Sequence, residues 1–166
     1  MKKLNSINKV SFKEEALYLE DIPINVGVNI ESWLKEFCNI SYKFENYSKS
    51  YSELQRVIFE DSPYIVIYLE NKNVERICIF PRVWENDSRC YQGDIFILDE
   101  RLEVPFLSDN IEKYFPNIQI KSKGYWDRFI AHESIDYLIN NDMKIEISMS
   151  RVPSLVGSLC LKKNEK

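Results

Sequence analysis

Three apolar runs separated by short polar turns constrain the fold of this chain more than any other feature. Val57–Phe59 is followed by the turn sequence Glu60-Asp61-Ser62-Pro63 and then by the longer run Tyr64–Leu69. Asn71-Lys72-Asn73 separates that run from Val74–Phe80. Short turns between such runs predict antiparallel neighbours, because parallel strands require a crossover of a dozen or more residues. We therefore expect an antiparallel meander whose middle strand, Tyr64–Leu69, is covered on both faces.

One segment shows clear helical periodicity. Ile30, Trp33, Leu34 and Phe37 have the spacing that places side chains on one face of a helix. Asn29 precedes them, where its side-chain oxygen can accept a hydrogen bond from a free N–H of the first turn. The pattern predicts an α-helix from residue 30 to residue 37, with Trp33 packed in the core.

The remaining apolar patterns are short and mostly strand-like. We expect strands at 16–20 and 22–27, a hairpin of 93–98 and 101–106 that turns at Asp99-Glu100, a short helix from Ser108 to Pro116, an edge strand at 117–121, and strands at 143–149 and 155–161. Segment 135–139 fits a strand or a helix. The turn residues at 140–142 favour a hairpin with 143–149.

These elements define the expected class. Strands dominate and no long helices separate them, so we expect an α+β fold with a mainly antiparallel sheet of meander and hairpins. Two or three short helices should pack on one face of it. A length of 166 residues suits one domain covering 1–166, and we expect loose ends at about 1–12 and 162–166.

The side chains that most enzymes need are scarce. His132 is the single histidine, and the four glycines (Gly27, Gly93, Gly124 and Gly157) form no phosphate-binding loop. The four cysteines (Cys38, Cys78, Cys90 and Cys160) lack the spacing of a metal site. We therefore expect a protein that is not an enzyme, with no catalytic residues, no metal and no cofactor.

Cysteine placement also bears on the compartment. Cys78 and Cys160 lie in apolar, strand-like runs, which favours buried free thiols. The sequence contains no signal-peptide core and no apolar run long enough for a membrane span. We expect a protein of the reducing cytoplasm that does not contact the membrane.

Acidic residues concentrate in one segment. Residues 84–112 contain eight acidic and two basic residues, a net charge of −6, whereas the rest of the chain carries +2. A clustered acidic surface accelerates encounter with a basic partner and disfavours direct binding of nucleic acid. The alternative is a solvated face that only promotes solubility. The predicted partner-binding residues are the acids and loop aromatics Trp84, Glu85, Asp87, Tyr91, Asp94, Asp99, Glu100, Glu103 and Trp126.

The chain resembles known bacterial proteins in two respects. The pattern from Tyr18 to Phe37, the meander, and Gln92–Leu98 with Val104 are similar to an uncharacterised bacterial β-meander domain over roughly two-thirds of the chain. A small acidic α+β chain without catalytic equipment also resembles the immunity proteins that neutralise polymorphic or contact-dependent-inhibition toxins. That resemblance implies a non-catalytic protein that occludes the active site of a basic toxin domain. The alternative is a structural or adaptor module of a phage or secretion apparatus. The oligomeric state is left open.

Overall fold

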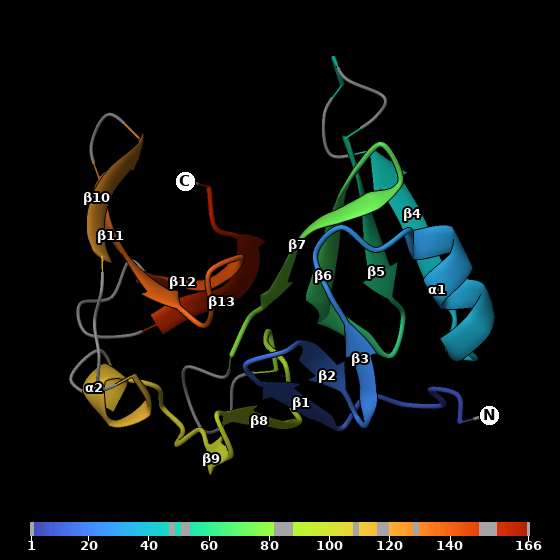
Figure 1. The fold of residues 1–166 in the computed structure, drawn as a ribbon, viewed down its shortest axis with the longest axis horizontal. Helices are drawn as coiled ribbons and strands as arrows, with labels where there is room; N and C mark the ends of the chain where they lie inside the picture. Colours follow the sequence, from blue (N-terminus) through green and yellow to red (C-terminus); the bar gives the residue numbers. More distant parts are fainter. Residues whose placement is uncertain are drawn as a thin grey trace.

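Two β-sheets and two α-helices make up the described part of the computed structural model (Figure 1). The structure describes residues 2–46, 49–50, 54–81, 88–107, 110–115, 120–127, 130–149 and 156–165. The helices are α1 (Ile30–Phe37) and α2 (Ile111–Tyr114). The strands are β1 (Lys9–Phe12), β2 (Leu17–Leu19), β3 (Ile22–Ile24), β4 (Tyr42–Asn46), β5 (Leu54–Phe59), β6 (Ser62–Glu70), β7 (Asn73–Ile79), β8 (Asp94–Ile97), β9 (Glu100–Arg101), β10 (Ile120–Asp127), β11 (Ile130–Leu138), β12 (Met143–Met149) and β13 (Val156–Lys163). The expected α+β class with a mainly antiparallel sheet is confirmed.

The larger sheet has eight strands in the order β10-β11-β12-β13-β7-β6-β5-β4. The predicted meander is present as β5, β6 and β7, and the segment that fitted strand or helix is strand β11, paired with β12. The two halves of the sheet meet where β13 pairs with β7, over residues 159–162 and 76–79. Figure 1 shows β4–β7 to the right and β10–β13 to the left of this joint.

Side chains of this sheet alternate between an apolar core face and a second face. The second face carries the charged residues of β11–β13 and, at the centre of the sheet, the buried Val66, Cys78 and Cys160. Ile65, Ile77 and Ile145 are fully buried on the core face. On the other face, Lys144 pairs with Asp136 at 2.9 Å and Lys162 with Glu146 at 2.8 Å. Because side chains on one strand point to opposite faces in turn, a polar ladder on one face accompanies an apolar core on the other.

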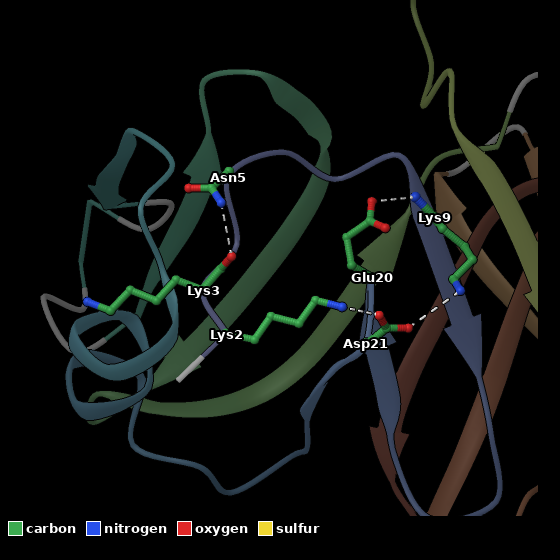
Figure 2. A network of polar contacts seen from close by, with 6 residues as sticks. All are labelled: Lys2, Lys3, Asn5, Lys9, Glu20 and Asp21. Carbon is green, nitrogen blue, oxygen red and sulfur yellow. Dashed lines mark hydrogen bonds and ion pairs between the residues drawn. The ribbon is translucent and has the colours of Figure 1, made fainter.

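The smaller sheet, of order β3-β2-β1-β8-β9, corrects the expectation of a loose end at residues 1–12. β1 lies at its centre, antiparallel to β2 and parallel to β8. Leu4, Ile7 and Val10 are buried in the same hydrophobic cluster as both sheets. Figure 2 shows that polar contacts also hold this end of the chain: Lys2, before β1, and Lys9, the first residue of β1, both pair with Asp21. In the sequence, Lys2, Lys3 and Lys9 give this stretch a polar composition that hid its role in the core.

The other predicted loose end, at 162–166, is also corrected for the described residues. β13 continues to Lys163, and the Asn164 amide donates a hydrogen bond to the Asp142 carbonyl at 2.8 Å. Both ends therefore owe their order to strand pairing with distant segments, which local composition does not reveal.

Helix α1 forms as predicted. Asn29 is its N-cap, and the side-chain oxygen of Asn29 accepts a hydrogen bond from the Ser32 amide at 3.1 Å. Ile30, Trp33 and Leu34 are buried against the core, while Phe37 is partly exposed. Among the described residues, neither helix is long and apolar enough to cross a membrane.

The expectation of two buried free thiols is wrong for Cys78 and Cys160. These residues lie directly opposite each other in the β7–β13 pair and are joined by a disulfide. They are 82 positions apart in sequence, so no local pattern could reveal their proximity. Disulfides persist mainly in oxidising environments, so the cysteine-based expectation of a reducing cytoplasm loses its support.

Candidate partner-binding surface

The middle of the acidic segment forms the β8–β9 hairpin, which has a two-residue turn. Ile97 pairs with Glu100, and the two residues between them, Leu98 and Asp99, adopt φ values of 48° and 70°. Two consecutive left-handed residues between antiparallel strands are the signature of a type I′ turn, whose twist matches that of the flanking strands. The turn therefore lies one residue earlier than the predicted Asp99-Glu100, and β9 is shorter than the predicted strand 101–106.

Packing on the rest of the molecule fixes this hairpin. β8 pairs with β1, and a side chain at Gly93 would collide with the Asn8 carbonyl and the Tyr91 hydroxyl. On the other side, the Tyr114 hydroxyl accepts a hydrogen bond from the Glu103 amide at 2.9 Å and donates one to the Arg101 carbonyl at 3.3 Å. The backbone from β8 to Glu103 is thus held between β1 and α2.

Ion pairs divide the acids of this segment into two groups. Asp94 pairs with Arg101 at 2.6 Å and Glu103 pairs with Lys113 at 2.8 Å. The hydrogen bond from Lys113 to Glu103 raises the pKa of the Lys113 ammonium. Within the part of the chain that the structure describes, neither Asp99 nor Glu100 has an ion-pair partner. Two acids without an ion-pair partner among the described residues therefore lie at the tip of the hairpin.

Two apolar side chains are exposed beside these acids. Leu98 at the tip is 40% exposed, and Val104, close to the base of the hairpin, is 37% exposed. We refer to Leu98, Asp99, Glu100, Glu103 and Val104 together as the hairpin surface. It combines negative charge with two exposed apolar side chains.

Leu98 occupies a conformation that suits other residues better. The β6–β7 turn has the same geometry, with φ of 50° at Asn71 and 65° at Lys72, and there the first position is asparagine. Asparagine tolerates the left-handed region because its short polar side chain bonds locally, whereas leucine gains nothing there. A strained residue that is also exposed suggests a role outside folding.

The structure brings together only part of the predicted site. Asp94, Asp99, Glu100 and Glu103 lie on or directly after the β8–β9 hairpin. The expectation that Tyr91 contacts a partner is corrected. Its side chain is 4% exposed, and its hydroxyl donates a hydrogen bond to the Ile7 carbonyl. Burial raises the pKa of the Tyr91 phenol well above its ordinary range.

Other predicted residues cannot be placed on this surface. Trp84, Glu85 and Asp87 lie outside the described residues, as does the side chain of Trp126, whose backbone belongs to β10. Sequence reasoning missed Leu98 and Val104. A leucine at the tip of a predicted hairpin was the available signal for the first of them.

The described residues also include a cleft of about 460 Å³, between the β6–β7 turn and the end of β13. Three lysines and three glutamates line it, among them Lys163 and Glu75, so its charges balance. Among the described residues, no group of three or more His, Cys, Asp or Glu side chains is placed to hold a metal ion.

Comparison with known proteins yields no match: no protein-family model, no curated protein and no solved structure is similar to this chain.

Proposed function

We propose that this protein is a non-catalytic binding protein that acts as an immunity protein, neutralising a cognate toxin by covering the toxin's active site with the hairpin surface. The observation that carries the proposal is the hairpin tip. There, an exposed leucine in a left-handed conformation lies beside two acids without a described ion-pair partner. Inhibitors of basic enzymes combine such charge with a few apolar anchors that become desolvated in the complex.

Charge at the tip would act mainly on association. Carboxylates at an exposed turn contribute a field that extends about 8 Å at physiological ionic strength, which steers a basic surface before contact. Leu98 would act after contact, by entering an apolar pocket and slowing dissociation. The two groups therefore make separate and measurable contributions.

Reversing the tip charges is expected to slow association without changing folding. Asp99→Lys with Glu100→Lys should lower the association rate with the basic protein encoded by an adjacent toxin gene, and should flatten its dependence on salt. Stopped-flow or surface-plasmon measurements at low and high salt measure both quantities. Unchanged rates and salt slopes would reduce the acidic segment to a solubility face.

A matched control is available on another hairpin. Glu60 and Asp61 are adjacent, exposed acids at the β5–β6 turn, so Glu60→Lys with Asp61→Lys changes the net charge by the same amount. This variant should retain most of the association rate. If both double variants slow association equally, only the total charge matters and the hairpin surface is not the contact. An adjacent structural gene of a phage or secretion apparatus, whose product binds this chain, would favour the adaptor function instead.

Leu98→Asn is expected to separate folding from binding. Asparagine adopts the left-handed conformation more readily, so the free energy of unfolding should rise by up to about 1 kcal/mol. Binding to the same toxin should weaken, through faster dissociation. Urea unfolding and dissociation rates provide the two measurements. A variant that is less stable than the parent would show that Leu98 contributes to the fold, and the proposed anchor role would be withdrawn.

A further inference from the structure

Within the described part of the chain, the outermost strand of the larger sheet, β4, has an open edge and exposed aromatic side chains. β4 is the last strand in the sheet order, and β5 is its one neighbour among the strands that the structure describes. Tyr42 is 40% exposed and Phe44 is 42% exposed, and their rings pack edge to face at 5.8 Å. Large exposed aromatics on a sheet edge mark a site where another strand can add.

Hydrogen bonding shows which backbone groups of β4 point outward. The Glu60 amide donates to the Ser41 carbonyl at 2.9 Å, and the register continues without a shift through Lys43↔Ile58 and Glu45↔Arg56. In an antiparallel pair, hydrogen-bonded positions alternate with positions whose amides point away. The N–H and C=O groups of Tyr42, Phe44 and Asn46 therefore point to the open edge.

The side-chain order of β4 is self-complementary in one antiparallel register. When Phe44 lies opposite Phe44 of a second copy, Tyr42 lies opposite Asn46, and Lys43 opposite Glu45. All five residues then have a partner, and the outward amides form the hydrogen-bonded pairs. Shifting the two-fold axis to Lys43 or Glu45 places like charges opposite each other, which destabilises a sheet. Shifting it to Tyr42 or Asn46 leaves part of the strand unpaired.

We propose that this edge is a homodimer interface, at which β4 of two copies pairs antiparallel about Phe44 and joins the two eight-stranded sheets. The isologous arrangement uses the same surface on both copies, as two-fold dimers do. It goes beyond the proposed immunity function and does not depend on it, because β4 and the hairpin surface belong to different sheets. The interface consists of one short strand pair, so the dimer forms in a concentration-dependent way.

Charge substitutions test the register directly. Lys43→Glu places two acids opposite each other at both ends of the pair, and Glu45→Lys places two lysines there, so each variant alone should be monomeric. An equimolar mixture should dimerise, because each Glu then faces a Lys. Sedimentation equilibrium with size-exclusion light scattering measures this. Lys72→Glu reverses an exposed lysine outside β4 that pairs with Glu31, and it should dimerise like the parent.

A second variant, which changes the backbone of β4, distinguishes loss of the dimer from loss of folding. Phe44→Pro removes an outward N–H that has no hydrogen-bond partner among the described residues, and proline is tolerated on the open side of an edge strand. It should abolish dimerisation and keep the far-ultraviolet circular dichroism of the parent. A parent that stays monomeric up to about 1 mM, the weak end of specific association, overturns the proposal. So does a mixture of the two charge variants that stays monomeric while the parent dimerises.

Discussion

Replacing Trp33 with alanine is expected to lower the free energy of unfolding by about 3–5 kcal/mol. The ring is 4% exposed, lies 5.9 Å from Phe37 between centroids, and donates a hydrogen bond from Nε1 to the Pro23 carbonyl at 2.9 Å. Truncation removes a large buried volume and also leaves that carbonyl without its partner. Because domains of this size are marginally stable, the loss is a large part of the total. Urea denaturation followed by circular dichroism measures it.

Two comparisons make this result specific. Trp33→Phe retains a ring but removes the donor, so its loss should be smaller than that of the alanine variant. Glu36→Ala changes an exposed residue of the same helix and should alter stability by less than about 0.5 kcal/mol. If Trp33→Ala also falls within that range, α1 does not pack against the core.

Reduction of the Cys78–Cys160 disulfide is expected to cost about 4 kcal/mol of stability. The bond closes a loop of 82 residues, and the chain-entropy treatment assigns a stabilisation of this order to loops of that length. The bond also lies in the joint where the two halves of the larger sheet meet. Thermal unfolding with and without a thiol reductant should show a clear fall in the midpoint.

Thiol counting tests the bond independently of stability. Unfolded in denaturant without reductant, the protein should titrate two thiols, whereas the reduced protein should titrate four. Cys78→Ala with Cys160→Ala should make the midpoint insensitive to reductant. Cys38→Ala with Cys90→Ala should leave the sensitivity intact, because neither residue takes part in the disulfide. Four thiols in the untreated protein would show that Cys78 and Cys160 are reduced, as the sequence alone predicts.

Local patterns determined the elements that need only neighbouring residues to form. The i, i+3, i+4 spacing and the Asn29 cap predict α1 because a helix satisfies its hydrogen bonds within one segment. The meander follows for a related reason, since β5, β6 and β7 are joined by short turns that restrict each strand to its neighbour. The acids of the hairpin surface were likewise visible as a run of charge.

Tertiary structure decided every feature that joins distant segments. The position of β1 between β2 and β8, the pairing of β13 with β7, and the disulfide across that pair depend on which apolar faces become buried together. The same dependence explains why Tyr91 is buried and is not an anchor: whether a loop aromatic is exposed depends on what packs over it. Leu98 became a candidate only when its φ and exposure were known. The hydrophobic periodicity of a segment indicates which of its side chains are buried, whereas contacts between segments depend on the whole chain.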